Sequence, residues 1–537
     1  MESLQQRVLL LSGVKRWAVA FVAGLVASLG LAPLHIFIAG FIAFPLIVWL
    51  LDGAVGFAGE GALKRLRPAF AVGWWFGFGY FIAGLWWIAN ALLVEARDFI
   101  WFIPLAVVGL PAVLALFYGA ACALARLVWS DGLGRVAALA FAFGVMELAR
   151  GYVATGFPWN AIGQTIMPVP VMMQSVSVIG AEAINALAVF VFALPAAMVG
   201  KNWRSAVAGV VCVGLLAAHV GFGVWRLSAP AEAPAENDVA ADMVRMRIVQ
   251  PSIDQSTKTA GADADDQFSL MLDLTGLASD DGRNPDVIIW PETAVPFILT
   301  RSPEAVSAIA ARLQPGQRLV TGAVRVEGDE GEAADQRRYY NSITVLDDEG
   351  IIIDAADKVH LVPFGEYLPF KDLLSNLGLR AVAAADRGYS AAPDRTMIEP
   401  LSGIRLLPLI CYEAIFARHA VMTGDMPAAI LNVSNDAWYG NTPGPYQHMH
   451  QARLRGIEQG LPLIRAANSG ISGAFDAYGR PLMAMLGYNV RGATDFDLPI
   501  QGPNTLYSQH GFRYLWLILG AFLVIALATS LRSRRSA

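Results

Sequence analysis

A cysteine, a glutamate and a lysine in this chain could together carry acyl transfer through a thioester. Cys411 lies in the run L-P-L-I-C-Y-E-A-I-F, Glu292 in I-I-W-P-E-T-A, and Lys358 in D-K-V-H-L-V-P-F-G-E-Y-L-P. Such chemistry needs a thiol nucleophile, a carboxylate that takes its proton and a cation that stabilises an oxyanion. All three residues lie in one polar block between two strongly apolar regions, so a membrane could supply the acyl group.

Cys411 follows an apolar run that predicts a strand and precedes Y-E-A-I-F, which predicts the start of a helix. A nucleophile on such a turn would be exposed, and the helix N-terminus would lower the pKa of its thiol. The alternative is a small buried core residue, which is common for cysteine. The other two cysteines, Cys122 and Cys212, fall in apolar stretches and are expected to be packing residues, so the chain predicts no disulfide framework.

Glu292 and Lys358 each lie beside apolar runs that favour burial. The run I-I-W-P would bury the Glu292 carboxylate near a sheet edge, and burial raises a carboxylate pKa and makes it a better proton acceptor. Lys358 lies between I-I-I-D-A-A-D and V-H-L-V-P-F-G-E, and Glu366, in the second of these runs, is placed to orient Lys358 or Glu292. Two alternatives stay open, a charge at a helix N-terminus for Glu292 and a solvated side chain for Lys358.

The composition predicts a protein that spans a bilayer. Hydrophobic residues make up 55% of the chain and charged residues 15%, against about 25% charged residues in ordinary globular proteins. About eight stretches of the chain could cross the hydrocarbon core as helices. They lie at 17–34, 36–52, 69–93, 100–128, 134–150, 170–199, 204–226 and 513–531, the second and fifth being near the lower length limit.

The distribution of basic residues predicts the orientation of these spans, because cytoplasmic loops are enriched in Lys and Arg. The basic residues cluster before the first span, in every second loop after it and behind the last span. They are Arg7, Lys15, Arg16, Lys64, Arg65, Arg67, Arg126, Arg135, Lys201, Arg204, Arg532, Arg534 and Arg535. Both termini are therefore expected in the cytoplasm and the polar block on the far side. The net charge of −5 and the lack of a long basic tract do not indicate nucleic-acid binding.

Four parts of the chain are predicted: a membrane domain at 1–226, a linker rich in Ala, Pro and Glu at 227–241, an exported domain at 242–510, and a last span with a cytoplasmic tail at 511–537. Within the exported domain, strand-like runs alternate with helical patterns, which predicts a layered α/β domain. The strand-like runs lie at 244–250, 286–290, 318–324, 342–346, 404–411, 428–433 and 463–468, and the helices near 264–279, 303–313 and 445–460.

The motifs W-P-E, D-K-x-H-L-V-P-F-G-E and I-C-Y-E, in this order, resemble the carbon–nitrogen hydrolase (nitrilase) superfamily. The resemblance implies an α-β-β-α sandwich with a catalytic Glu-Lys-Cys triad. It makes Glu292 the base, Lys358 the oxyanion stabiliser and Cys411 the nucleophile.

Four further features narrow the resemblance to one family of this superfamily. They are the preceding spans, the run T-G-F-P-W-N at 155–160, the run S-N-D-A-W-Y-G at 434–440 and the closing span. The whole chain resembles the apolipoprotein N-acyltransferase family of the Gram-negative inner membrane. Carried onto this sequence, the resemblance implies that Glu366 assists the triad and that Tyr412 and Glu413 shape the site beside the thiol.

Three further residues are candidates for lining the substrate site. Asn435 and Trp438 lie in the S-N-D-A-W-Y-G run after a predicted strand, where a structural turn is the alternative, and Trp159 lies in T-G-F-P-W-N. One position departs from the family pattern. The family often has a tryptophan after Q-S-x-K, whereas Thr259 follows Q-S-T-K in this chain, so that substrate contact is absent or is supplied elsewhere.

The resemblance implies a two-step reaction. Cys411 would take an acyl chain from a phospholipid, usually phosphatidylethanolamine in this family, and pass it to the α-amine of a diacylglyceryl-cysteine on a lipoprotein. Neither a metal ion nor ATP is expected to take part. His448 and His450 lie two residues apart on a predicted helix and cannot face one metal site together.

Two other functions remain open. A membrane-tethered hydrolase of small nitriles or amides would use the same triad with water as the acceptor, although a single span would suffice as its tether. A transporter or receptor would place acidic residues inside its spans, and Glu147 and Glu182 are the main such residues here.

Overall fold

A computed structural model describes residues 2–56, 59, 61–94, 99–200, 202–228, 243–256, 263–328, 337–369, 388–421, 424–500 and 502–536. Most of the predicted linker and Thr259 lie outside these residues. The chain forms two compact units, of which the first contains Met1–Ala89, Trp101–Pro230 and Thr505–Ala537, and the second Asn90–Ile100 and Ala231–Asn504.

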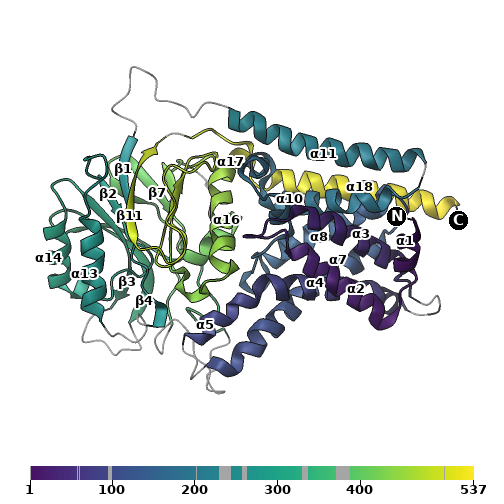
Figure 1. Ribbon diagram of the computed structural model, residues 1–537, viewed down its shortest axis with the longest axis horizontal. Helices are drawn as coiled ribbons and strands as arrows, with labels where there is room; N and C mark the ends of the chain where they lie inside the picture. Colours follow the sequence, from purple (N-terminus) through teal and green to yellow (C-terminus); the bar gives the residue numbers. More distant parts are fainter. Residues whose placement is uncertain are drawn as a thin grey trace. The chain divides into compact units, whose positions relative to one another are not determined.

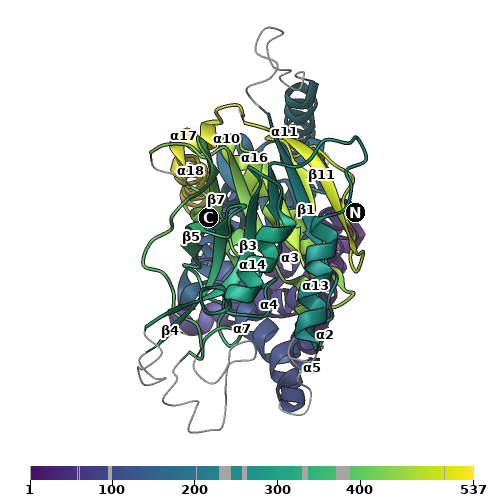
Figure 2. The ribbon, with the colours of Figure 1, turned by 90° about the vertical axis from the view of Figure 1, so that its left-hand side faces the viewer.

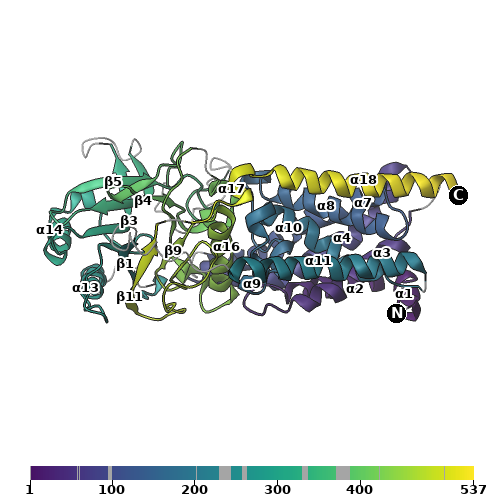
Figure 3. The same cartoon turned by 90° about the horizontal axis from the view of Figure 1, so that it is seen from above.

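The first unit consists of helices, the longest of which run alongside one another (Figures 1 and 3). They are α1 (Glu2–Leu9), α2 (Gly13–Ser28), α3 (Gly40–Gly53), α4 (Ala62–Leu85), α7 (Leu110–Leu127), α8 (Leu133–Arg150), α9 (Pro170–Met173), α10 (Val176–Ala193), α11 (Trp203–Ser228), α17 (Leu506–His510) and α18 (Arg513–Ser536). Small residues allow α2 and α4 to approach closely. A Cβ atom at Gly24 would lie only 2.0 Å from the carbonyl oxygen of Phe76, as is typical of contacts between membrane helices.

Five helical segments of the described chain are long and apolar enough to cross a membrane. They are Ala62–Leu93, Ile100–Leu127, Val176–Ala197, Trp203–Ser228 and Arg513–Ser533, and Phe37–Gly53 is a shorter apolar helix. The predicted stretches at 17–34 and 134–150 coincide largely with α2 and α8. The chain is thus a membrane protein with an inserted α/β domain, while the total of about eight spans stays a prediction.

The second unit contains two sheets. The first sheet has the strand order β11-β1-β2-β3-β4-β5 and the second β10-β9-β8-β7-β6. The strands are β1 (Met243–Gln250), β2 (Val287–Ile289), β3 (Arg318–Glu327), β4 (Arg338–Leu346), β5 (Ile352–Asp357), β6 (Ile398–Leu401), β7 (Ile404–Pro408), β8 (Ala429–Ser434), β9 (Leu463–Ala467), β10 (Gly473–Phe475) and β11 (Gly492–Pro499). The helices include α5 (Ala89–Leu93), α13 (Ala264–Thr275), α14 (Pro303–Arg312) and α16 (Pro443–Gln459).

The sheets and helices of this unit form four layers. Phe268 and Met271 of α13 and Ile309 of α14 share a buried core with the first sheet, so these two helices cover its outer face (Figures 1 and 2). Met449 and Ala452 of α16 share a second core with strands of the other sheet. The predicted α-β-β-α sandwich is therefore confirmed.

Strand directions bring the ends of separate strands to the same edge. β2 and β3 are parallel, β4 runs against β3, and β5 runs against β4, so the carboxyl ends of β2 and β5 lie at one edge of the first sheet. In the second sheet β7, β8 and β9 are parallel. Glu292 follows β2, Lys358 follows β5, and Cys411 follows β7. Sites in layered α/β domains are commonly built at such carboxyl ends.

Each of the seven strand-like runs contains a strand, and each predicted helix of this domain is present. The sequence did not predict β5, β6, β10 and β11. β11 has the sequence G-A-T-D-F-D-L-P, whose Gly, Asp and Pro residues disfavour strands. Among the described strands, it pairs with β1 alone, at the edge of its sheet. Tertiary pairing therefore decides its conformation.

Candidate active site

The side chains of Glu292, Lys358 and Cys411 come together in one buried cluster. The Nζ atom of Lys358 lies 2.8 Å from Oε1 of Glu366 and 3.6 Å from Oε1 of Glu292. The Cys411 thiol interacts electrostatically with both Glu292 and Lys358. Lys358 has no exposed surface, and Glu292 and Cys411 are 6% and 7% exposed. The structure thus brings the three predicted site residues together in one buried cluster.

Asn341 on β4, which sequence reasoning missed, joins the two carboxylates. Its Nδ2 atom donates to Oε1 of Glu292 at 2.7 Å and to Oε1 of Glu366 at 2.8 Å. The backbone N–H of Asn435 donates to the other Glu292 oxygen at 2.8 Å. Glu292 is therefore held on both sides. The sequence signal that could have pointed to Asn341 was an amide side chain at a strand position that faces the interior.

Glu366 anchors the lysine. Besides the Lys358 ammonium and Asn341, its carboxylate accepts a hydrogen bond from the Val362 N–H at 2.8 Å. Burial alone would lower the pKa of Lys358, but the negative charges of Glu366 and Glu292, together with Cys411, outweigh it and raise that pKa overall. Lys358 is consequently a permanent cation at the site.

The environment of Cys411 differs from the sequence-based expectation. The strand ends at Pro408, and the thiol lies on a five-residue 3₁₀ turn, η9 (Cys411–Ile415), not at the start of an α-helix. Cys411 is buried rather than exposed. Burial first, and then the charge of Glu292, raise the pKa of the thiol against the opposing effect of Lys358. The predicted lowering of this pKa is wrong, because burial favours the neutral thiol of Cys411.

The backbone of Cys411 adopts an unusual conformation. Its φ angle is 51°, in the left-handed region that residues other than glycine rarely occupy. Such a conformation costs about 1–3 kcal/mol and persists only where the surroundings enforce it. The turn that carries Cys411 is therefore held by contacts to its neighbours.

Glu413 provides one such contact. It accepts hydrogen bonds from the Ile410 N–H before the thiol at 2.8 Å and from the Val359 and His360 N–H groups after Lys358, both at 2.9 Å. Arg395 pairs with it at 2.8 Å. Burial alone would raise the pKa of Glu413, but Arg395 and these donors outweigh it and lower that pKa to about 2. Glu413 thus ties the cysteine turn to the lysine segment.

Tyr412 is buried beside the thiol, and its ring stacks on His360 with the centroids 5.8 Å apart. Asn435 belongs to the site through its N–H bond to Glu292, and its Nδ2 atom donates to Gln255 at 2.7 Å. Trp438 is half-buried on the short turn η11 (Asp436–Tyr439). Contact of Asn435 and Trp438 with substrate stays a prediction.

Trp159 lies in the first unit, the helical unit of the chain, and its residue is 1% exposed. Its ring packs on Trp87 with a centroid distance of 5.0 Å, and its carbonyl accepts a hydrogen bond from Arg150 at 2.8 Å. These contacts make it part of the core of that unit, and a role in lining the substrate site stays a prediction.

Glu147, one of the acidic residues inside the predicted spans, forms a buried ion pair with Arg150 at 2.5 Å and accepts a hydrogen bond from the Tyr118 hydroxyl at 2.5 Å. Arg150 in turn donates to the carbonyls of Phe157 and Trp159. The pair therefore fixes the 157–159 segment, which gives Glu147 a structural reason to be buried.

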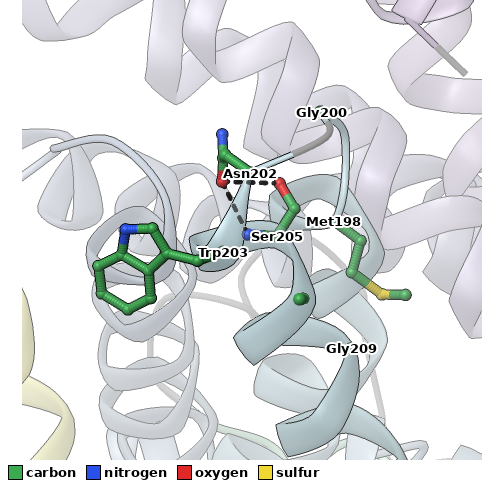
Figure 4. A pocket seen from close by; sticks show the side chains of 7 residues that line it. Met198, Gly200, Asn202, Trp203, Ser205 and Gly209 are labelled. Carbon is green, nitrogen blue, oxygen red and sulfur yellow. Dashed lines mark hydrogen bonds between the residues drawn. The ribbon is translucent and has the colours of Figure 1, made fainter.

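A shallow pocket of about 510 Å³ lies at the start of α11, lined in part by Met198, Trp203 and Gly209 (Figure 4). Asn202 Oδ1 accepts from the Ser205 N–H at 3.0 Å and caps the helix there. Among the described residues that line this pocket, none carries an acid, a base or a thiol. Within the described part of the chain, no group of three or more His, Cys, Asp or Glu side chains is arranged to hold a metal ion.

Two parts of the chain match models of known protein families. Family models match at residues 23–194, described as the apolipoprotein N-acyltransferase N-terminal domain, and at 245–492, described as carbon-nitrogen hydrolase. A solved structure of a carbon-nitrogen hydrolase from Helicobacter pylori G27 covers 52% of this chain and 94% of its own at 13% identity and a TM-score of 0.36, too low to support a conclusion.

Full-length relatives are much more similar. The chain is 52% identical over 529 residues to a protein of Rhizobium meliloti (strain 1021), covering 98% of each. It is 51% identical over 538 residues to a protein of Agrobacterium fabrum (strain C58 / ATCC 33970), covering 100% of this chain and 99% of the relative. It is 50% identical over 533 residues to one of Brucella suis biovar 1 (strain 1330), covering 99% of each. All three carry the name apolipoprotein N-acyltransferase. The chain belongs to the apolipoprotein N-acyltransferase family.

Proposed function

We propose that this protein transfers a fatty acyl chain from a membrane phospholipid to the α-amine of the N-terminal diacylglyceryl-cysteine of apolipoproteins. Membership of the family supports N-acylation in lipoprotein maturation. The observation that carries the chemistry is the buried cluster in which Lys358 lies between Glu292 and Glu366 and beside the Cys411 thiol. It contains one group for each duty that a thioester mechanism requires.

In the first half-reaction Glu292 takes the thiol proton, and the sulfur of Cys411 attacks an ester carbonyl of the phospholipid. Lys358 and the backbone N–H of Tyr412 stabilise the oxyanion of the tetrahedral intermediate. The C–O bond then breaks, Glu292 returns the proton to the departing oxygen, and a lysophospholipid leaves. The enzyme retains the acyl chain as a thioester on Cys411.

In the second half-reaction the α-amine of the lipoprotein attacks the thioester carbonyl, and Glu292 takes a proton from the amine. The C–N bond forms, the C–S bond breaks, and the proton returns to the Cys411 sulfur. Because an amide is more stable than a thioester, this step favours the product. The thioester must be protected from water, which fits a buried thiol.

The charges at the site support Glu292 as the base. Moving the thiol proton to Glu292 creates a thiolate and removes a carboxylate charge, so the net charge of the buried cluster does not change. Lys358, held by Glu366, remains a cation throughout and faces first the thiolate and then the oxyanion. A reaction with constant net charge avoids the large cost of burying a new charge.

The proposed acyl donor is phosphatidylethanolamine, and the proposed location is the bacterial inner membrane with about eight spans. The distribution of Lys and Arg residues supports cytoplasmic termini and a periplasmic catalytic domain. In the variants Glu304→Cys and Asp131→Cys, both at exposed positions, an impermeant maleimide should label only residue 304 in cells with a permeabilised outer membrane. Labelling of residue 131 alone would reverse the orientation.

Transfer itself is tested with purified protein, phosphatidylethanolamine labelled in its acyl chain and a diacylglyceryl-cysteine peptide. The expected products are the N-acylated peptide and lysophospholipid, neither of which forms with Cys411→Ala. Hydrolysis of soluble amides without transfer to the peptide would instead identify a tethered hydrolase. Full transfer by Cys411→Ala would refute the thioester mechanism.

A further inference from the structure

A buried polar network lies against the backbone of the nucleophile, on residues to which the proposed reaction gives no role. The Nε2 atom of His448, on α16, lies 3.1 Å from the carbonyl oxygen of Cys411. Because a carbonyl oxygen can only accept a hydrogen bond, Nε2 must carry the proton of this contact. A weaker second donor, Nδ2 of Asn432, lies 3.4 Å from the same oxygen and only 2.5 Å from the Leu409 carbonyl.

The imidazole of His448 is fixed from its other side. Its Nδ1 atom lies 2.9 Å from Oδ1 of Asp436 and 3.1 Å from Nη2 of Arg465. Arg465 also donates to Oδ2 of Asp436 at 2.6 Å, and the Ser434 hydroxyl donates to Oδ1 at 2.7 Å. The side chains of His448, Asp436 and Arg465 have no exposed surface. Rotation of the ring would leave a buried charge or dipole unpaired, so the ring is held in place.

The contact with the Cys411 carbonyl has a consequence on the other side of the peptide bond. The C=O of Cys411 and the N–H of Tyr412 belong to one planar trans peptide unit, in which the two groups point in opposite directions. Fixing the carbonyl on His448 therefore fixes the direction of the Tyr412 N–H. A hydrogen bond to the carbonyl also polarises the peptide and makes its N–H a stronger donor.

This peptide needs such a support because of its backbone. With Cys411 at a φ angle of 51°, the turn is not in a conformation that it would adopt unaided. Rotation of the Cys411–Tyr412 peptide changes ψ of the first residue and φ of the second, and it moves the Cβ and sulfur of Cys411 little. The direction of the N–H group can therefore change while the thiol stays in place.

We propose that His448 is a positioning residue that orients the Cys411–Tyr412 peptide, so that the Tyr412 N–H serves as the second oxyanion donor opposite Lys358. With the proton on Nε2, the Nδ1 atom of His448 accepts from Arg465, which is itself paired with Asp436, and this holds the imidazole for that purpose. The inference rests on the proposed function, because only a reaction with a tetrahedral oxyanion requires that donor.

A matched pair of variants tests it. In His448→Gln the amide Nε2 can take the place of the imidazole Nε2 and reach the Cys411 carbonyl. In His448→Asn the shorter side chain can bond to Asp436 but cannot reach that carbonyl. For each purified full-length variant, two rates are measured: acylation of Cys411 by phosphatidylethanolamine and alkylation of Cys411 by iodoacetamide. Alkylation needs the thiol but forms no oxyanion.

For His448→Asn we expect acylation to slow about 10- to 100-fold, with the alkylation rate unchanged, and for His448→Gln we expect both rates within about threefold of the wild type. Equal losses of both rates in His448→Asn would show a general structural role and overturn the inference, as would wild-type acylation. If His448→Asn does not fold, His448→Gln decides alone: retained acylation supports the inference, and a loss with normal alkylation overturns it. Failure of the proposed function is distinguishable, since the wild type itself would then form no acyl-enzyme.

Discussion

The Nζ atom of Lys358 donates a hydrogen bond to Oε1 of Glu366 at 2.8 Å, whereas its distance to the nearest oxygen of Glu292 is 3.6 Å. The lysine is thus anchored mainly by Glu366. Glu292, the other carboxylate, interacts with the Cys411 thiol and, after burial, is the second cause of its raised pKa. These distances support the proposed division of roles, in which Glu366 holds the cation and Glu292 exchanges the proton.

This division predicts opposite effects on thiol ionisation and on catalysis. In Glu292→Gln the negative charge near Cys411 is lost, so the pKa of the thiol should fall, while acyl transfer should drop about 10²- to 10⁴-fold because no base remains. The pH dependence of iodoacetamide alkylation measures that pKa. Glu366→Gln serves as the control, and its alkylation profile should move less. An upward or absent shift in Glu292→Gln would contradict the assigned role.

Removing the buried cation should destabilise the protein as well as inactivate it. Lys358→Met leaves Glu292 and Glu366 buried close together without their partner. The expected cost is about 3–5 kcal/mol, visible as a lower midpoint in thermal unfolding in detergent. The double variant Lys358→Met/Glu366→Gln should recover part of this loss, because only one carboxylate then lacks its partner. An unchanged midpoint in the single variant would mean that the cluster is not buried as described.

The lowered pKa of Glu413 predicts that the stability of the protein depends on pH. Its pKa is lowered from 4.5 to about 2, so its stabilising effect is fully present above pH 4.5 and is lost as the pH falls towards 2. At neutral pH the effect corresponds to about 3 kcal/mol. The thermal midpoints of the wild type and Glu413→Gln should therefore differ at pH 7 and converge between pH 4.5 and 2. A constant difference over this range would argue against the charged contacts of Glu413.

In the helical unit, Arg150→Lys should not be a conservative change. The guanidinium binds Glu147 and the carbonyls of Phe157 and Trp159 at once, and a single ammonium cannot reproduce this geometry. We expect a lower thermal midpoint and faster proteolysis near residues 157–159. The variant Arg204→Lys, at the start of α11 and outside this network, is the matched control. Equal stability of both variants would show that the network does not hold the segment.

Much of the architecture was predictable because its signals are local. Apolar runs bounded by polar residues marked the central strands, and the three motifs at their ends marked Glu292, Lys358 and Cys411, which the structure brings together. Asn341, His448 and Arg465 were not predictable, since their importance comes from contacts between strands and helices that are far apart in sequence. The environment of Cys411 was predicted wrongly for a similar reason: a run that indicates a helix start forms a 3₁₀ turn, and burial next to Glu292 reverses the expected change in pKa.

The most direct test of the account is the intact mass of the purified protein after incubation with phosphatidylethanolamine, alongside Cys411→Ala. The wild type should gain the mass of one fatty acyl group, the variant should gain nothing, and addition of a diacylglyceryl-cysteine peptide should remove the added mass. A wild-type protein that transfers acyl chains to the peptide without ever carrying this mass, or a Cys411→Ala variant that carries it, would contradict a thioester on Cys411.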